Sequence, residues 1–387
     1  MKKNIYFPSR RSDVYSFQVM DILEQTKSME SKGQTIYHLE LGEPLNKTPK
    51  KVLRRASELL TEKVPGYTPS NGILDLRIKV SEYYKTKHSL YVDPDQVFIT
   101  SGSSGAFVLT FLASFDHGAK IGIFNPVYPA YRNILKSLDL EVIEIKNDIE
   151  NNGKIDISKI SKYKNLNGLV ISSPNNPTGQ IFSKDELEFI YNFCEQNNII
   201  LISDEIYHGI EFDTKTYPLI SFGKNVITIN SFSKFFCMPG WRIGWAIVPK
   251  NFQNNFLKLS QNLFISSSNI GQYSAIKVFD CLNELNKNIR IYQDNRKILF
   301  NVLSNFDVID FINPTGAFYF YLNIKKTGLL SKTFTRNLLK DTGVAITPGH
   351  DFDKFNGDYT VRVSFSSDNY IIKTAADKIF YWLKKYY

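Results

Sequence analysis

The stretch that decides the fold is IILISDEIYHG, residues 199–209, in which a short apolar run is followed at once by two acids. An apolar run of this length is typical of a strand that is buried on both faces of a parallel sheet. Helical patterns separate it from similar runs at 96–100, 120–124, 141–145, 168–172, 226–230 and 243–248. The alternation predicts an α/β fold, with a three-layer α/β/α large domain around a mainly parallel seven-stranded sheet. One of the helical patterns, 183–198, opens with a capping box formed by Ser183 and Glu186.

Both ends of the chain mix helices with strands instead. The expected elements are a helix at 13–32, strands at 37–41, 308–312, 317–322 and 359–365, and helices at 286–305, 331–340 and 370–385. We predict that residues 1–45 and 286–387 form one smaller α+β domain, entered through the helix near 286–305. Residues 46–285 then form the large domain.

Composition and charge exclude several classes of protein. The formal net charge is +9, but the basic residues are scattered and no run of them exceeds a pair, so we expect a solvated surface and no nucleic-acid partner. No apolar run approaches the roughly 18 residues of a membrane helix. Three cysteines lie far apart, without a CxxC pair or a signal peptide, which indicates the cytoplasm. We predict no metal site.

The loops at the carboxyl ends of parallel strands are where α/β proteins bind ligands. The turn SGSSGAF, 101–107, leads into a helix, whose first N–H groups could hold a phosphate with the hydroxyls of Ser103 and Ser104, or could be a plain connection. Tyr128 in NPVYPAY could stack on a flat heterocycle or pack in the core. Asn176 in SPNNPTG either directs an amide at a ligand or belongs to a simple turn.

Two charged residues are expected at buried strand positions. Asp204 directly follows the run 199–203, and a buried acid is costly unless it meets a cation or a strong donor. Tyr207 would lie on the same side if a helical turn follows, or would pack in the core. Arg362, in RVSFS, alternates with apolar residues and therefore needs an anion, from a substrate or from a structural salt bridge.

The segment NSFSKFFCMPGWRIGW, 230–245, follows the next strand. Ser231, Ser233 and Arg242 offer hydroxyls and a guanidinium that suit a phosphate. Lys234 lies among apolar residues, and a lysine held beside cations has a lowered pKa and forms a Schiff base with an aldehyde. A phosphate cradle, a stacking ring, an acid for a pyridine nitrogen and such a lysine together indicate pyridoxal 5'-phosphate.

These residues resemble the fold-type I, class I/II pyridoxal-phosphate aminotransferases. The matching motifs run in order through most of the chain: LELGEP, YTPSNGILDLR, TSGSSGAF, NPVYPAY, SPNNPTG, DEIY, SFSKFFCMPGWRIGW, PTGAFYFYL and RVSFS. Thirty residues separate Asp204 from Lys234 (234 − 204) and eight separate Lys234 from Arg242 (242 − 234), as in that family.

The resemblance implies a role for each candidate residue. Lys234 would form the Schiff base and then move the proton between the substrate Cα and the cofactor, while Asp204 would keep the pyridine nitrogen protonated. Arg362 would bind the substrate α-carboxylate, assisted by Asn176 and the backbone at Gly42. The remaining implied ligands are Asn176 and Tyr207 at the ring oxygen, Tyr128 on the ring, and Ser103, Ser104, Ser231, Ser233, Arg242 and a second subunit's Tyr67 at the phosphate. A homodimer with shared active sites follows.

The implied reaction is the transfer of the α-amino group of an L-amino acid to a 2-oxo acid, by a ping-pong mechanism through the pyridoxamine form. A β-eliminating C–S lyase on the same fold is one alternative, and a non-catalytic sensor of the cofactor is another. Because a regulator of this kind normally carries an added DNA-binding domain, the early start of the family pattern disfavours the sensor.

Two departures from the family pattern concern the substrate. GEPLN stands in place of the commoner GEPDF, and Ser104 stands where some relatives that use dicarboxylates carry a lysine. Tyr15 and Phe17 are expected near the entrance of the site. We therefore expect neutral or aromatic amino acids to be the better donors, with 2-oxoglutarate as an acceptor if Arg10 or Arg11 swings in.

Overall fold

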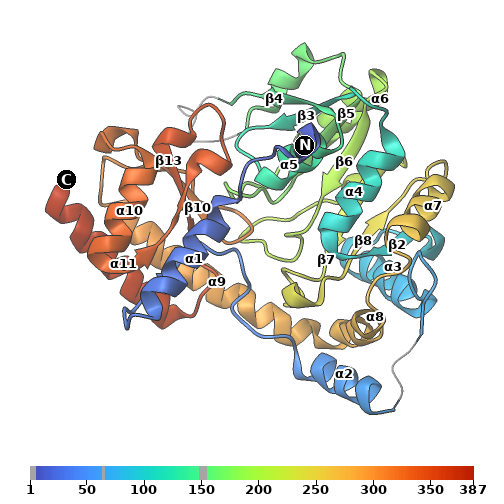
Figure 1. The fold of residues 1–387 in the computed structure, drawn as a ribbon, viewed down its shortest axis with the longest axis horizontal. Helices are drawn as coiled ribbons and strands as arrows, with labels where there is room; N and C mark the ends of the chain where they lie inside the picture. The colour runs from blue at the N-terminus through green and yellow to red at the C-terminus, as the bar shows by residue number, and fades with distance from the viewer. Residues whose placement is uncertain (1–5, 63–65, 148–154) are drawn as a thin grey trace, which may run out of the picture.

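The computed structural model describes residues 6–62, 66–147 and 155–387, and it contains a seven-stranded sheet (Figure 1). The strand order is β2-β8-β7-β6-β5-β3-β4, and only β8 runs antiparallel to its neighbours. Its strands are β2 (Val97–Thr100), β3 (Lys120–Phe124), β4 (Glu141–Ile145), β5 (Gly168–Ser172), β6 (Ile200–Asp204), β7 (Val226–Ser231) and β8 (Gly244–Ile247). All seven predicted strands are confirmed to within one residue at each end. The predicted mainly parallel α/β fold is therefore correct.

Helices cover both faces of this sheet, and the alternation of side chains along each strand explains why. In β2, Phe98 packs with residues of the helices on one face, whereas its neighbours Val97 and Ile99 pack on the other. The first face carries α4 (Gly102–Ser114), α5 (Pro129–Ser137) and α7 (Gln253–Leu263), and the second carries α3 (Leu74–His88) and α6 (Lys184–Gln196). The capping box predicted for α6 is confirmed, because Ser183 and Glu186 bond reciprocally. We call these elements, with α2 (Lys50–Glu62) and α8 (Asn269–Ala275), the large-sheet part.

Both ends of the chain meet in a second unit, the small-sheet part. Its strand β1 (Tyr37–His38) pairs with β11 (Val344–Ala345), which joins the N-terminal segment to the C-terminal one. Its other elements are the sheet β12-β13-β10-β9 (Thr347–Pro348, Thr360–Ser364, Tyr319–Asn323 and Asp310–Phe311) and the helices α1 (Gln18–Glu30), α10 (Ser331–Thr342) and α11 (Asn369–Tyr386). The predicted α+β unit built from both ends is therefore confirmed. The exact division of the chain at residues 45/46 and 285/286 stays a prediction, and residues 1–5, 63–65 and 148–154 of those ranges lie outside the described part.

The helix α9 (Leu282–Leu303) runs along both parts, as Figure 1 shows. The predicted N-terminal helix was placed too early, because α1 begins at Gln18 and not at residue 13. Phe17 has an extended backbone, and the Gln18 N–H donates to Oδ2 of Asp351 at 2.7 Å. A side chain more than 300 positions away thus fixes where α1 begins, which no local pattern reveals. In the described residues, no helix has both the length and the apolar character needed to cross a bilayer.

Candidate active site

Asp204 is the last residue of β6 and is buried. Its Oδ2 accepts a hydrogen bond from the Tyr131 hydroxyl, and its Oδ1 accepts one from the Ile206 N–H at 3.0 Å. Burial raises the pKa of Asp204 to about 6, although both hydrogen bonds and the charge of Lys234 act in the opposite direction. The carboxylate therefore still lacks a strong cationic partner. Tyr131 was not predicted, although it is the last residue of the quoted motif NPVYPAY and lies in α5.

Lys234 lies just beyond the end of β7, and its ammonium is directed toward the small-sheet part. Its Nζ donates to the Gly42 carbonyl at 2.6 Å and lies 5.9 Å from the centroid of the Tyr207 ring. Burial lowers the pKa of Lys234 to about 8, and the positive charge of Arg362 lowers it further than that of Arg242 does. A free amine is therefore far more accessible at neutral pH than for an ordinary lysine.

Tyr207 lies in the turn after β6, and its hydroxyl bonds the hydroxyl of Tyr319 at 2.8 Å. The Tyr319 hydroxyl also lies against Gly42, where an added Cβ would be only 1.9 Å from it. Gly42 therefore has no room for a side chain. Tyr319 was quoted within PTGAFYFYL but not assigned a role. Its contact with Tyr207 joins the turn after β6 to a strand of the other sheet, β10.

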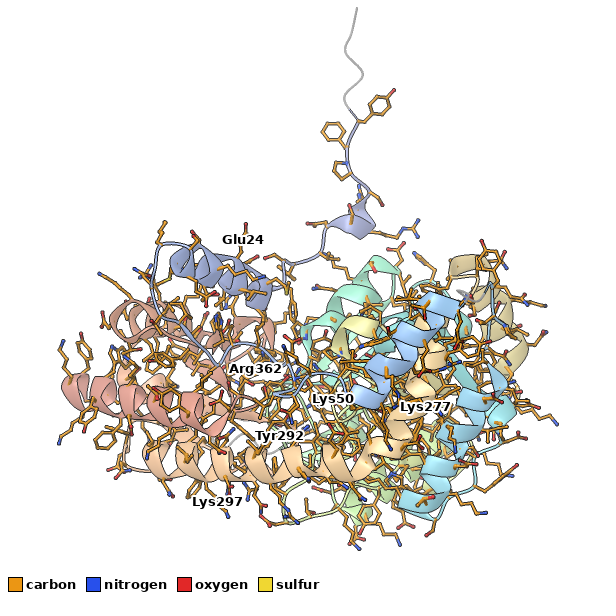
Figure 2. All side chains as sticks on the ribbon, turned by 90° about the horizontal axis from the view of Figure 1, so that it is seen from below. Glu24, Lys50, Lys277, Tyr292, Lys297 and Arg362 are labelled. Atoms are coloured by element: carbon orange, nitrogen blue, oxygen red, sulfur yellow. The ribbon has the colours of Figure 1, made fainter. Side chains whose placement is uncertain are left out.

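Arg362 on β13 is buried, with 3% of its surface exposed, and lies in the interior of the molecule (Figure 2). It donates from Nη1 to Oδ1 of Asn176 at 3.0 Å and from Nη2 to the Glu40 carbonyl at 2.7 Å. Its guanidinium carbon lies 4.4 Å from the ring centroid of Tyr319 and 4.6 Å from that of Phe352. We call these five residues the Arg362 slot.

All the hydrogen-bond acceptors that Arg362 meets are neutral. Among the described residues it forms no ion pair, so the structural salt bridge considered from the sequence is not found. A buried guanidinium whose charge is not balanced favours the binding of an anion. Because a guanidinium binds a carboxylate through two parallel hydrogen bonds, the Arg362 slot suits a small carboxylate ligand.

A second anion site is formed where α4 begins. Ser101, at its N-cap, makes no side-chain capping bond, so the first N–H groups of α4 lack that partner. A Cβ added at Gly102 would lie 2.5 Å from Nη2 of Arg242, which places this guanidinium directly against the helix start. Ser233 directly precedes Lys234 and is buried. Its hydroxyl accepts a hydrogen bond from that of Ser231 at 2.9 Å. Ser231 is thereby engaged within the protein, whereas Ser233 keeps its own proton to donate.

The remaining candidate residues are placed as follows. Ser103 and Ser104 lie in the first turn of α4, and Ser104 is exposed. The Tyr128 ring packs edge-on against Tyr131 at 5.5 Å and Phe17 at 6.0 Å. Tyr67 is 89% exposed and is not brought into the site by its own chain.

These groups fit pyridoxal phosphate. Helix-start N–H groups and a guanidinium suit its phosphate, a buried acid without a cation suits its ring nitrogen, and an amine of lowered pKa suits its aldehyde. The cradle at Gly102, which a Cβ would fill, is the observation that supports this fit most directly.

Known proteins similar to this chain point to the same chemistry. Residues 35–379 match the family model described as aminotransferase class I and II. A (5-formylfuran-3-yl)methyl phosphate transaminase of Methanocaldococcus jannaschii is 36% identical over 96% of this chain and 97% of its own. A valine–pyruvate aminotransferase of Mycobacterium tuberculosis is also 36% identical, over 96% and 97%. The crystal structure of an aminotransferase from Mycobacterium tuberculosis superposes with a TM-score of 0.94 at 35% identity, over 98% of this chain and 100% of that one.

Class I aminotransferases use pyridoxal phosphate, which agrees with the residues gathered around Lys234. The matched family model extends over most of the chain, from β1 to α11, and so includes both the large-sheet and the small-sheet part. The chain therefore belongs to the class I and II aminotransferase family and is an aminotransferase.

Proposed function

We propose that this aminotransferase moves the α-amino group of an L-amino acid to a 2-oxo acid in two half-reactions of a ping-pong mechanism, with pyridoxal phosphate held at Lys234. The observation that carries the proposal is the unbalanced guanidinium of Arg362, which lies close enough to Lys234 to lower its pKa. Both substrates of such a reaction carry a carboxylate next to the reacting carbon, so one fixed cation serves both half-reactions.

The cofactor, when bound, supplies an aldehyde that reacts with amines and a ring that accepts the electrons left when the substrate Cα loses its proton. Asp204 would hold a proton on the ring nitrogen, and Asn176 and Tyr207 would hydrogen-bond the ring oxygen. The start of α4, Ser233 and Arg242 would hold the phosphate, with Ser103, Ser104 and Ser231 around them. The amine of Lys234 would take the proton from the substrate Cα and then donate it to the cofactor.

The exposure of one tyrosine is consistent with a second subunit at the site. Tyr67 is exposed in the single chain, yet the family resemblance assigns it to the phosphate of a neighbouring subunit. We propose a homodimer in which Tyr67 of each chain completes the partner's site, and we keep the cytoplasm as the proposed location. Measurement of the mass in solution, for the wild-type chain and for Tyr67→Phe, tests the assembly.

The substrate proposal rests on the entrance of the site. Phe17 packs against Tyr128, and Ser104 stands where some relatives that use dicarboxylates carry a lysine, so neither position brings a cation to this approach. Arg10 and Arg11 are exposed in the segment that precedes α1, where they are free to meet a distal carboxylate. The two relatives act, by their names, on a furan phosphate and on valine with pyruvate, so they do not select one donor. We propose neutral or aromatic L-amino acids.

The test is a single half-reaction of the loaded enzyme with one amino acid and no acceptor. We expect the cofactor absorption to change once per site and one equivalent of the matching 2-oxo acid to form. A C–S lyase would instead release pyruvate and ammonia from cystathionine or cysteine in many turnovers, and a sensor would bind the amino acid without either product. Either of these outcomes would replace the proposed reaction.

A further inference from the structure

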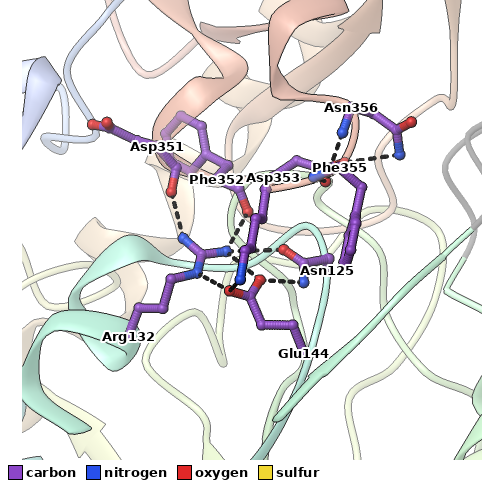
Figure 3. Close-up of polar contacts among 9 residues, drawn as sticks. Asn125, Arg132, Glu144, Asp351, Phe352, Asp353, Phe355 and Asn356 are labelled. Carbon is purple, nitrogen blue, oxygen red and sulfur yellow. Dashed lines mark hydrogen bonds and ion pairs between the residues drawn. The ribbon is translucent and has the colours of Figure 1, made fainter. Parts of the chain in front are cut away.

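Arg132 on α5 is a second arginine near the site, and it bonds both parts of the molecule (Figure 3). Its Nε donates to Oε1 of Glu144 at 3.0 Å, and its Nη2 donates to Oε2 of Glu144 at 3.1 Å and to Oδ1 of Asn125 at 2.9 Å. These acceptors belong to the large-sheet part. Arg132 and Glu144 are 15% and 7% exposed, so this two-pronged ion pair is shielded from water.

The other acceptors of Arg132 belong to the small-sheet part. Its Nη1 donates to the Asp351 carbonyl at 2.7 Å, and its Nη2 donates to the Phe352 carbonyl at 3.2 Å. The Phe352 carbonyl also accepts from the N–H of Val127 at 2.9 Å, which precedes α5. Arg132 therefore fixes the backbone of the segment 351–352 to the large sheet.

Phe352 links this network to the substrate-binding cation. Its ring is fully buried and lies on the guanidinium of Arg362, on which the Tyr319 ring also lies. The orientation of a guanidinium decides whether it offers two parallel donors to a carboxylate. A shift of the backbone at Phe352 would move one wall of the Arg362 slot and thereby turn those donors.

Arg132 itself does not suit a substrate carboxylate. Nη2 already faces three acceptors, Nε and Nη1 each face one, and the charge is balanced by Glu144. Lys354 lies 3.9 Å from the same carboxylate, so Glu144 is already held by two cations of the protein. The role of Arg132 toward the reaction must therefore be exerted through the segment that it holds.

We propose that Arg132, oriented by Glu144, is a positioning residue for carboxylate binding: it holds the carbonyls of Asp351 and Phe352 so that the Phe352 ring keeps Arg362 in its two-donor orientation. This inference rests on the proposed role of Arg362 as the ligand of the substrate α-carboxylate. It assigns substrate affinity to an ion pair that touches neither substrate nor cofactor.

The test compares Arg132→Met with Arg77→Met in the loaded enzyme. Arg77 is the control, since it is buried and donates at 3.0 Å both to a carboxylate, Asp95, and to a backbone carbonyl, that of Pro94, but within the large-sheet part alone. We expect Arg132→Met to raise KM for L-phenylalanine and L-alanine roughly tenfold to a hundredfold with little change in kcat, as for a misplaced binding group. Arg77→Met should leave KM unchanged.

Three further measurements separate positioning from general damage. Reactions of 2-phenylethylamine and ethylamine, which lack the carboxylate, should be affected little by Arg132→Met, and the cofactor absorption spectrum should not change. Arg132→Lys should recover part of the affinity, because it keeps the charge but loses the fork that reaches two carbonyls. If Arg132→Met does not fold, Glu144→Gln replaces it, with the same pattern expected at smaller size.

The Kd of 3-phenylpropanoate, measured by titration of the loaded enzyme, separates this inference from the proposed function, because it needs no turnover. A weaker Kd in Arg132→Met but not in Arg77→Met supports the positioning role, even if the wild-type enzyme were to catalyse another reaction. The positioning role is wrong if the wild-type enzyme transaminates and both variants change KM and Kd alike. It is also wrong if Arg132→Met slows the reactions of the amines as much as those of the amino acids.

Discussion

Asp204 and Lys234 stand at the ends of the neighbouring strands β6 and β7, whereas Arg362 is surrounded by residues from four other segments of the chain. The first pair is placed by the sheet itself, because parallel strands bring their carboxyl ends to one edge. The Arg362 slot is placed by the contact between the two parts of the molecule. The first region should therefore control the chemical step, and the second should control substrate binding.

The largest effect is expected at the strand ends, for Lys234→Ala. Loss of the amine removes both the group that binds the aldehyde and the group that moves the proton, so kcat should fall roughly 10⁴-fold or more. The measurement is steady-state transamination with cofactor occupancy followed by absorption. Lys87→Ala is the control, since Lys87 also lies over a ring, that of Phe235 at 5.5 Å, but outside the site. Turnover of Lys234→Ala near the wild-type rate would refute the assignment of Lys234.

Asp204→Asn should keep the cofactor but lower kcat roughly 10²- to 10⁴-fold, because an amide does not hold the ring proton. Glu205→Gln is a closely matched control. Glu205 is the next residue, is equally buried, and accepts bonds from Ser203 and the Leu219 N–H at 3.0 and 3.1 Å. Burial raises the pKa of Glu205 to about 8, so this carboxyl group is mostly protonated at pH 7. The neutral amide of Glu205→Gln therefore differs little from the group that it replaces. If both variants lose activity equally, Asp204 is a structural acid.

In the Arg362 slot, Arg362→Ala should act on KM far more than on kcat. Truncation of one partner of a buried charge pair costs roughly 2–5 kcal/mol, which is the loss of kcat/KM expected for L-phenylalanine. The kcat/KM for 2-phenylethylamine, which has no carboxylate, should fall much less. Equal losses of kcat/KM for the two donors would contradict the division of the site into a region for the chemical step and a region for substrate binding.

The sequence predicted these two regions unequally well. The seven strands were found because strands buried on both faces form uninterrupted apolar runs, and the strand-end rule then led to Asp204 and Lys234. Tyr319 and Phe352 have no such signal, because their contact with Arg362 depends on how two sheets pack. Arg132 looks like a surface residue of α5 until the loop at 351–352 is placed beside it. The start of α1 was missed for the same reason, since Asp351 decides it.

The two regions are coupled through charge, which pH can measure. Burial and the charge of Arg362 are the two largest causes that lower the pKa of Lys234 to about 8. The unfolded chain therefore binds this proton more tightly than the folded one, so the contribution of Lys234 to stability rises with pH from about 8 to the ordinary value of 10.5. In the apoprotein, the rate of cofactor uptake should rise with pH through a midpoint near 8, as the free amine forms.

Arg362→Ala should move that midpoint to higher pH, because one of the two main causes of the low pKa is removed. Arg77→Ala, which removes a buried arginine outside the site, should leave it in place. A midpoint unchanged in Arg362→Ala would show that the charge of Arg362 does not lower the pKa of Lys234.

The smallest expected effect concerns the choice of amino donor. It tests whether the binding region contacts any part of the substrate besides the α-carboxylate. A side-chain carboxylate that enters a closed site needs its own cation, since an unpaired buried charge costs several kcal/mol, roughly. Ser104 offers only a hydroxyl, Arg132 is already paired with Glu144, and Arg10 and Arg11 are exposed. We therefore expect kcat/KM for aspartate to lie below the values for phenylalanine, alanine and methionine. An aspartate value tenfold above the others, about 1.4 kcal/mol, would mean that a cation such as Arg10 or Arg11 closes over the distal carboxylate. Substitution of these two arginines by glutamine would then abolish that preference without changing the values for alanine.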